Sequence, residues 1–187
     1  MRIDWINIES VSKELTDSFY SGDETFDFFL KEKARDWQDS GEAATYIFAD
    51  KDEIDSGYLT RIFGYASINA TGLLNYHDKE AEYLSCAEIR MFAIQNALRS
   101  NGDPTRKFSD IIFNSLLANL YYIATHTVGF KAIYLNANQA GKSLYLENGF
   151  QEVSNYVIPT AESMLDIEGT TPMILMINDN FIDQVFS

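Results

Sequence analysis

An apolar strand, a long amphipathic helix and a second apolar strand follow one another in the middle of the chain. The first strand covers residues 87–94, the helix begins at Ser109 and ends near Thr127, and the second strand covers residues 132–135. Two strands joined in this way pair in parallel, because a parallel pair needs a crossover of a dozen or more residues, usually a helix. The segment therefore predicts a parallel strand pair with a helical crossover.

The remaining segments add strands and helices around this unit. A helix opens at residues 21–24 and continues with residues at helical spacing: Phe26, Phe29, Leu30, Lys33, Ala34 and Trp37. A short helix is expected at residues 140–147, before Asn148 and Gly149. Further strands are expected at residues 2–8, 45–49, 63–70, 150–158 and 173–177. The class is a mixed α/β (α+β) fold.

Three stretches predict turns or loops. The acidic run 50–55 is expected to be a solvated turn, residues 75–78 a loose connection, and residues 95–107 a polar loop. Ser109 is expected to cap the helix that follows, because its hydroxyl can accept a backbone N–H of the first turn.

Length and composition indicate one globular domain spanning residues 1–187. Hydrophobic residues make up 46% of the chain and aromatic residues 14%, which is enough to bury a sizeable core. No run of about 18 apolar residues predicts a membrane span, and the first residues do not resemble a secretory signal. Cys86 is the only cysteine, so the chain has no internal disulfide. These features lead us to expect a cytoplasmic protein with no membrane partner.

The charge of the chain constrains its partners. Fourteen Lys and Arg residues against 28 Asp and Glu residues give a formal charge of −14. Such a field argues against nucleic acid, which is bound by neutralising phosphates with basic side chains, and favours a cationic small molecule or a basic peptide. The alternative is that the acidity only maintains solubility. The oligomeric state stays open, a homodimer included.

Residues 138–150 carry the most specific motif. The segment reads Asn-Gln-Ala-Gly-Lys-Ser-Leu-Tyr-Leu-Glu-Asn-Gly-Phe, with Gly149 placed where a helix ends in a left-handed backbone. Asn138, a small residue three positions later, Leu144 before Tyr145, and Gly-Phe four residues past the tyrosine resemble the signature of the GNAT acetyltransferase superfamily. The resemblance implies an α/β/α sandwich with a mostly antiparallel central sheet and one splayed parallel pair.

Two more segments share this resemblance. Residues 87–94 are similar to the fourth strand of the superfamily, whose backbone edge at Met91, Phe92, Ala93 and Ile94 would then bind the pantetheine of acetyl-CoA. Glu88 matches the position of the general-base glutamate in the histone acetyltransferases of the superfamily. Residues 21–70 resemble the amino-terminal half of GNAT proteins, including the toxin branch of toxin–antitoxin pairs.

The segment that would bind the pyrophosphate departs from the superfamily pattern. The superfamily uses several glycines there, so that backbone N–H groups approach the phosphates, whereas residues 98–109 contain only Gly102. Basic residues offer a substitute, because residues 89–109 hold four of them and one acid. The residues expected to contact the cofactor are, besides Asn138 and Tyr145, Arg99, Gly102, Arg106, Lys107 and Ser109.

The resemblance implies an acetyl-CoA-dependent N-acetyltransferase that transfers acetyl directly to an amine. Tyr145 would protonate the departing thiolate, because a phenol with an ordinary pKa of about 10 keeps its proton until a base of similar strength develops. Glu88 would remove the amine proton. Two alternatives remain: a toxin that acetylates aminoacyl-tRNA, and a degenerate relative that binds a ligand without turnover.

Other reactive side chains predict no site. His77 and His126 have no Cys or carboxylate at ligand spacing, so no metal is expected. His126 is expected to interact with its helix end. Cys86 is interpreted as a small packed side chain.

Overall fold

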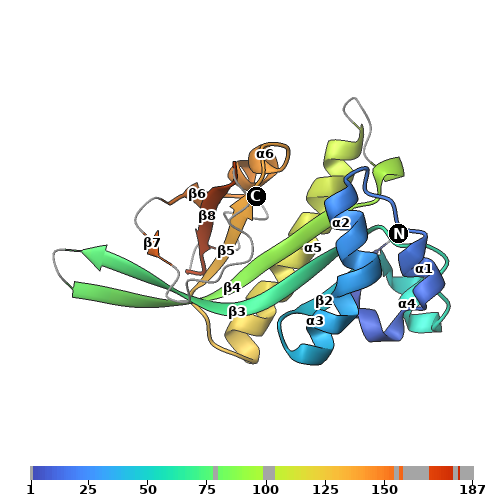
Figure 1. The fold of residues 1–187 in the computed structure, drawn as a ribbon, viewed down its shortest axis with the longest axis horizontal. Coiled ribbons are helices and arrows are strands. Elements are labelled where there is room, and N and C mark those ends of the chain that lie inside the picture. Colours follow the sequence, from blue (N-terminus) through green and yellow to red (C-terminus); the bar gives the residue numbers. More distant parts are fainter. Residues whose placement is uncertain are drawn as a thin grey trace. The chain divides into compact units, whose positions relative to one another are not determined.

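The computed structural model describes residues 2–77, 80–98, 104–153, 156–157, 169–178 and 181, with the backbone alone described at residues 75–77, 80–81, 104–107 and 156–157. It contains both helices and strands, with several helical segments between β1 and β2 (Figure 1). The sheet order is β1-β2-β3-β4-β5-β8-β6, with β7 paired to β3. Only β4 and β5 pair in parallel among the pairings that the described residues show. The expected mixed α+β class is therefore confirmed.

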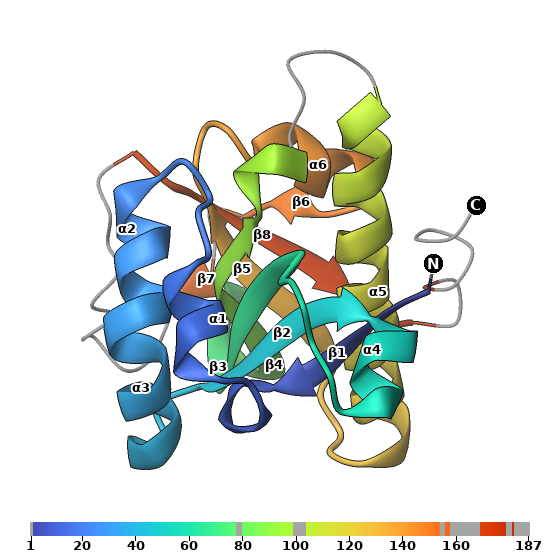
Figure 2. The same ribbon diagram turned by 90° about the vertical axis from the view of Figure 1, so that its right-hand side faces the viewer.

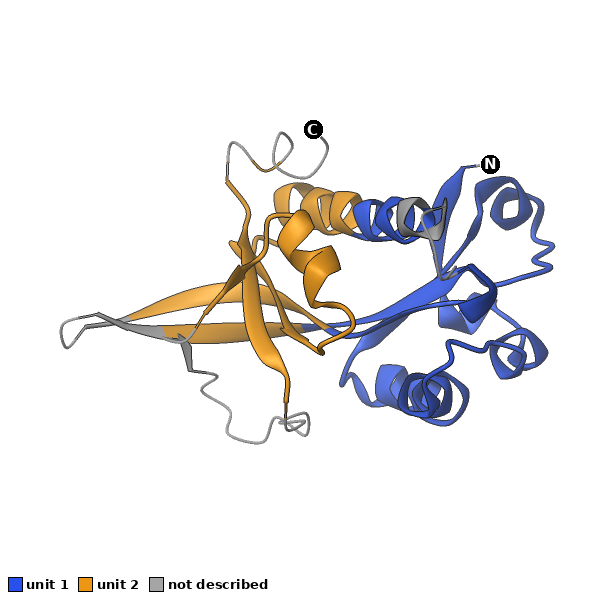
Figure 3. Cartoon of the chain, turned by 90° about the horizontal axis from the view of Figure 1, so that it is seen from above, with its two compact units in different colours: residues 1–69, 90–116 blue, residues 70–89, 117–187 orange. Residues whose placement is uncertain are grey.

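The chain divides into two compact units, which Figure 3 colours separately. Unit 1 contains residues 1–69 and 90–116, and unit 2 contains residues 70–89 and 117–187. Strands β3 and β4 and helix α5 each contribute residues to both units. A single domain over the whole chain remains a prediction.

Unit 1 is built on strands β1 (Ile3–Asn7), β2 (Ala44–Asp50) and the first part of β3 (Gly64–His77). The pairs are antiparallel, with Trp5 opposite Phe48 and Ile47 opposite Tyr65. Within this unit α2 and α3 cover one side of the strands and the first half of α5 the other (Figure 2). The layers are thus helix, sheet and helix.

A helical arm precedes β2. It consists of α2 (Glu24–Phe28), a π-helical turn η2 (Phe29–Lys33) and α3 (Ala34–Ser40). The Asp23 carboxylate caps α2 by accepting the N–H of Thr25 at 2.9 Å. The π turn was not predicted. Leu30 and Ala34 are buried, whereas Lys33 is exposed, contrary to the helical row expected from the sequence.

The aromatic side chains of this arm pack on β3. Phe29 lies 6.0 Å from Tyr65, ring centre to ring centre, and Trp37 lies 4.9 Å from Phe29. The Tyr65 hydroxyl donates to the carbonyl of Phe26 at 2.8 Å. Burial, with the charges of Asp27 and Asp23, raises the pKa of Tyr65 well above its ordinary value, so this phenol stays protonated as a donor.

Three short helical segments lie at the connections of unit 1. They are η1 (Ile8–Ser10), α1 (Lys13–Asp17) and α4 (Lys51–Ser56). The turn expected at residues 50–55 is wrong. The Asp50 side chain accepts the N–H of Asp52, Lys51 pairs with Asp55 at 2.7 Å, and Gly57 ends the helix at φ +71°. The Asp50 cap, the Lys51–Asp55 ion pair and Gly57 together stabilise a helix in a segment whose acidic composition had indicated a turn.

Strands β3 and β4 are longer than expected. β3 continues through residues 75–77, where the sequence predicted a loose connection, and β4 covers Glu80–Ile94. Leu74 and Asn75 pair with Val157 and Tyr156 of β7 (Tyr156–Val157), and this pairing accounts for the extended backbone of a polar stretch.

The end of β4 and the start of α5 also differ from the prediction. A 3-10 turn, η3 (Asn96–Leu98), follows β4, and α5 covers Pro104–His126. The helix begins at Pro104 rather than at Ser109, which lies within it. Proline is favoured at the first position of a helix because its missing N–H would have no helical partner there.

Unit 2 is built around the parallel pair. Residues Cys86–Ile89 of β4 lie opposite Ala132–Leu135 of β5 (Ala132–Ala137), which confirms the predicted pairing. Strand β8 (Thr171–Met176) pairs with β5, and β6 (Gln151–Glu152) pairs with β8. Six buried side chains of this unit pack together in one cluster: Leu73, Leu84, Cys86, Ala132, Tyr134 and Ile174.

Gly64 provides a test of the packing in unit 1. A Cβ at this position would lie 2.7 Å from the Ala93 carbonyl oxygen, and backbone cannot move aside as a side chain can. We expect Gly64→Ala to lower the free energy of unfolding by about 1–3 kcal/mol, measured by chemical denaturation. Gly129→Ala is the matched control, because nothing lies within 4 Å of its Cβ position, and it should change stability by less than about 0.5 kcal/mol. Equal stability of the two variants would contradict this packing.

Candidate active site

Glu88 is a buried carboxylate on β4. It is 8% exposed and lies opposite Tyr134 in the parallel register. On its own strand it follows Leu84 and Cys86 at two-residue spacing, and both of those side chains belong to the apolar cluster of unit 2. A glutamate in a strand is mostly solvated, so the burial of Glu88 sets it apart from an ordinary surface residue.

Tyr145 lies in helix α6 (Lys142–Glu147) of the same unit. It is the buried member of the Leu144–Tyr145 pair, whereas Leu144 is only half-buried. Its ring centre is 5.9 Å from that of Phe150, and its carbonyl accepts the N–H of Phe150 at 3.0 Å. The helix end beyond it has Gly149 at φ +84°, as predicted. These contacts hold the Tyr145 ring in place.

Asn138 organises the turn that leads into this helix. Its Oδ1 accepts the N–H of Gly141 at 2.8 Å. A Cβ on Gly141 would lie 3.0 Å from the Tyr145 ring and 3.2 Å from Asn138 Oδ1, so the glycine allows the ring to lie close to the turn. The sequence predicted Asn138 as a cofactor contact, and the structure gives it a part in positioning Tyr145.

The strand segment expected to bind pantetheine belongs to unit 1. The side chains of Met91, Ala93 and Ile94 are buried, and Phe92 is half-buried with its ring 5.1 Å from that of Phe113 in α5. The side chains of this segment therefore serve the core. The expected contact between the backbone of this segment and pantetheine remains a prediction.

The basic segment lies largely outside the described side chains. Arg99 and Gly102 lie outside the described residues, and Arg106 and Lys107 are described by their backbone alone, within α5. Ser109 lies in the second turn of the same helix and is half-buried. The expected contacts of these five residues with a pyrophosphate remain predictions.

Arg90 has a more specific environment than the sequence indicated. Only 9% of its side chain is exposed, its guanidinium lies 4.4 Å from the centre of the Trp37 ring, and its Nη1 lies 3.6 Å from Glu42 Oε2. Its Nε is buried without a hydrogen-bond partner in the described part of the chain. From the sequence, Arg90 was only one of the four basic residues within 89–109. Tryptophan is a common partner of arginine, but no sequence spacing linked these two residues.

Cys86 is not a nucleophile. Burial raises the pKa of its thiol to about 12, and the nearby charge of Glu88 adds to the shift. The thiolate, which is the reactive form, is therefore scarce at neutral pH. The predicted role as a packed side chain is confirmed by its 3% exposure.

Neither a metal-binding group nor a membrane-spanning helix occurs among the described residues. His, Cys, Asp and Glu side chains form no group of three or more there that could hold a metal ion. None of the helices in the same ranges combines the length and hydrophobicity that a membrane span requires. His126, in the last turn of α5, lies 3.2 Å from the Tyr122 carbonyl and stacks on the Tyr122 ring, in agreement with its predicted place at the helix end.

No protein-family model and no curated protein matches the chain. Solved structures do match it over nearly its full length. A tyrosine-to-phenylalanine mutant of KacT is 15% identical, with a TM-score of 0.68 and 100% of both chains covered. AtaTR bound with acetyl-CoA is 13% identical, with a TM-score of 0.68, covering 100% of this chain and 99% of the other. AtaT complexed with acetyl-methionyl-tRNAfMet is 14% identical, with a TM-score of 0.67 and 99% of both chains covered.

At these identities the likeness establishes a shared fold. It confirms the architecture expected from the resemblance to the GNAT superfamily and its toxin branch, with a mostly antiparallel sheet and one parallel pair.

The thiol of Cys86 offers a direct check of the geometry around Glu88. With its pKa raised to about 12, the folded protein should react with Ellman's reagent at least about 100-fold more slowly than an exposed cysteine at pH near 8. Unfolding in guanidinium chloride should release one reactive thiol per chain, since Cys86 is the only cysteine. A Ser40→Cys variant, at an exposed position, should show one fast thiol in the folded state. Fast reaction of the unmodified folded protein would show that this side of β4 is open.

Proposed function

We propose that the chain is an acetyl-CoA-dependent N-acetyltransferase that transfers acetyl directly to an amine. The observation that carries the proposal is the full-length likeness to AtaTR, solved with acetyl-CoA. The burial of Glu88 and Tyr145 supports it, because both groups suit acid–base chemistry and both belong to unit 2. Acetyl-CoA would act as a cosubstrate, and the chemistry requires no metal.

Each proposed residue has one task in this reaction. Glu88, directly or through a water, accepts the proton that the acceptor nitrogen loses as it attacks the thioester carbonyl. The Tyr145 phenol donates a proton to the sulfur as the carbon–sulfur bond breaks. Backbone N–H groups of Met91–Ile94 would bind the pantetheine amides and the developing oxyanion. Arg99, Gly102, Arg106, Lys107 and Ser109 would hold the pyrophosphate, and Asn138 would orient the turn before Tyr145.

A second candidate acceptor is an aminoacyl-tRNA. The likeness to AtaT, solved with acetyl-methionyl-tRNAfMet, favours it. The formal charge of −14 opposes it, because a tRNA needs a broad basic surface. A third candidate is a degenerate relative without turnover, which the single glycine of residues 98–109 favours. A cationic amine remains the acceptor that we propose.

Replacing Tyr145 by Phe tests the proposed acid. The phenyl ring keeps the contact with Phe150 and loses only the hydroxyl, so folding and acetyl-CoA affinity should change little. The turnover number should fall by about 10²–10⁴, measured by release of free CoA thiol. Tyr121→Phe is the matched control, because that ring stacks on Phe181 elsewhere in unit 2, and it should keep full turnover. Full activity of Tyr145→Phe would show that Tyr145 is only a packing residue. If calorimetry at low salt detects no binding of acetyl-CoA to the unmutated chain, the proposal itself is contradicted.

The charge of the chain predicts the order of acceptors. Spermidine and a lysine-rich peptide should be acetylated faster than an amine that carries no second cation, such as glycinamide, or an amine that also carries carboxylates, such as glutamate. Their second-order rate constants should fall as salt rises, because the field of the protein is screened beyond about 10 Å at 0.1 M salt. Rate constants that do not depend on the charge of the acceptor would show that the acidity of the chain does not determine which acceptor it uses. Faster acetylation of methionyl-tRNA than of spermidine would favour the second candidate.

A further inference from the structure

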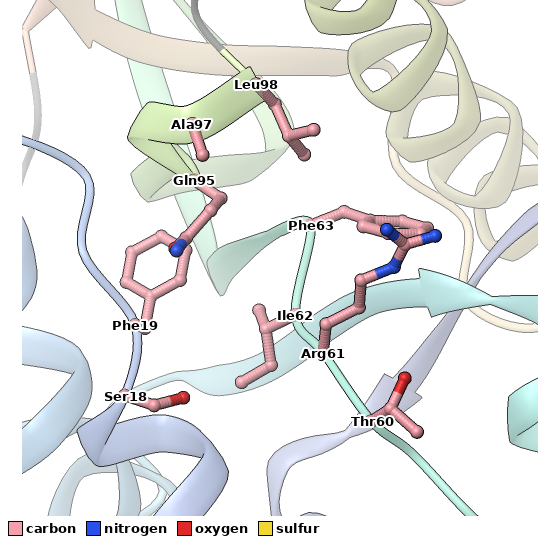
Figure 4. A pocket seen from close by; sticks show the side chains of 9 residues that line it. All are labelled: Ser18, Phe19, Thr60, Arg61, Ile62, Phe63, Gln95, Ala97 and Leu98. Carbon is pink, nitrogen blue, oxygen red and sulfur yellow. The ribbon is translucent and has the colours of Figure 1, made fainter.

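Unit 1 contains a hollow that the proposed reaction does not use. It has a volume of about 220 Å³ and lies where the loop before β3, the loop after α1 and the end of β4 meet (Figure 4). We call it the Phe63 hollow. Its lining residues are Ser18, Phe19, Thr60, Arg61, Ile62, Phe63, Gln95, Ala97 and Leu98.

The walls of the Phe63 hollow are mainly apolar. Phe19 and Phe63 lie on opposite sides of the hollow, and Ile62 lies between them (Figure 4). All three side chains are at most 5% exposed, so they are fixed parts of the core rather than mobile surface groups. Ala97 and Leu98 of η3 close the remaining side. An apolar group of matching size would be removed from water on several sides here.

The polar side chains that line the hollow are Ser18, Thr60, Arg61 and Gln95. Arg61 is the one charged residue among the nine that line it, in a chain with a formal charge of −14. Its guanidinium lies 5.0 Å from the centre of the Phe63 ring, which places the cation beside the apolar wall. Glu53 accepts the N–H and the hydroxyl of Thr60 at 2.7 and 2.8 Å, and these bonds, together with the charge of Arg61, lower the pKa of its carboxyl. A bound anion would share Arg61 with Glu53 without displacing the bonds to Thr60.

Gln95 adds a fixed amide on the Phe19 side of the hollow (Figure 4). Its Oε1 accepts the N–H of Tyr20 at 3.0 Å, and its backbone N–H donates to the Phe63 carbonyl at 2.9 Å. The next N–H, of Asn96, donates to the Tyr20 carbonyl at 2.7 Å. These bonds occupy the amide oxygen of Gln95 and leave its NH₂ group as the donor that the side chain can offer a ligand.

We infer that the Phe63 hollow binds a small carboxylate whose apolar part is a single ring or a branched chain. The apolar part contacts Phe19, Ile62 and Phe63, and the carboxylate accepts from Arg61. Arginine is suited to this because its planar guanidinium binds a carboxylate through two parallel bonds. The size follows from the volume, since pockets for drug-sized ligands hold about 300–1,000 Å³. The site needs no acetyl transfer and does not depend on the proposed function.

Binding of phenylacetate to the full chain tests this site, followed by ¹H–¹⁵N NMR. We expect saturable shifts at the amides of Phe19, Ile62 and Leu98, with a dissociation constant on the order of 1 mM for so small a ligand. Phenylacetamide has the same shape without the charge and should bind at least about 5-fold more weakly. Equal binding of the two probes, or shifts that do not saturate, would overturn the inference.

Two variants locate the binding. Arg61→Gln should remove the preference for phenylacetate, whereas Arg2→Gln, which removes the same charge from an exposed pair with Asp52, should keep it. Ala97→Phe fills the hollow from an exposed position and should abolish binding of both probes while the NMR spectrum remains that of a folded protein. Loss of the preference in Arg2→Gln as well would reduce the effect to overall charge. Acetyl-CoA should leave phenylacetate binding unchanged, and displacement of phenylacetate by acetyl-CoA would assign the hollow to the cosubstrate instead.

Discussion

The parallel pairing of Cys86–Ile89 with Ala132–Leu135 constrains the path of the rest of the chain. Two strands that run in the same direction can be joined only by a segment that returns along the sheet, and α5 provides that return. At about 1.5 Å per residue, its 23 residues span roughly 35 Å. Because β4 and α5 are both long, each contributes to both compact units. The proposed cosubstrate segment 91–94 therefore belongs to unit 1, whereas Glu88 and Tyr145 belong to unit 2.

The sequence predicted those elements whose apolar pattern is strong. The buried residues of β4, β5 and α5 alternate or recur at the spacing of a strand or helix, so their type and order were clear before the structure. Helix α4 was missed because it has no buried residue, and its stability comes from the Asp50 cap, the Lys51–Asp55 pair and Gly57. The polar end of β3 was missed for a related reason: its partner, β7, lies about 80 residues further along the chain. Local pattern cannot predict such a pairing.

The candidate site was predictable in its residue types but not in their environments. The motif around Tyr145 and the position of Glu88 came from the resemblance, and no feature of the sequence showed that both side chains would be buried. Arg90 illustrates the limit most clearly. Its partners Trp37 and Glu42 lie about 50 residues earlier, on α3 and just after it, so only the folded chain brings the cation, the ring and the carboxylate together. The Phe63 hollow likewise joins three separate segments.

The π-helical turn at Phe29–Lys33 makes the orientation of the residues after it depend on the length of one short segment. A π turn holds one residue more than an α-helical turn of the same extent, so it corresponds to a single-residue insertion in a regular helix. Deleting one residue between Phe29 and Lys33 would leave an uninterrupted helix from Glu24 to Ser40, in which Trp37 rotates by about 100° relative to Phe29. The edge-on contact between these two rings, and the face that Trp37 turns toward Arg90, therefore depend on the number of residues in this turn as much as on their identity.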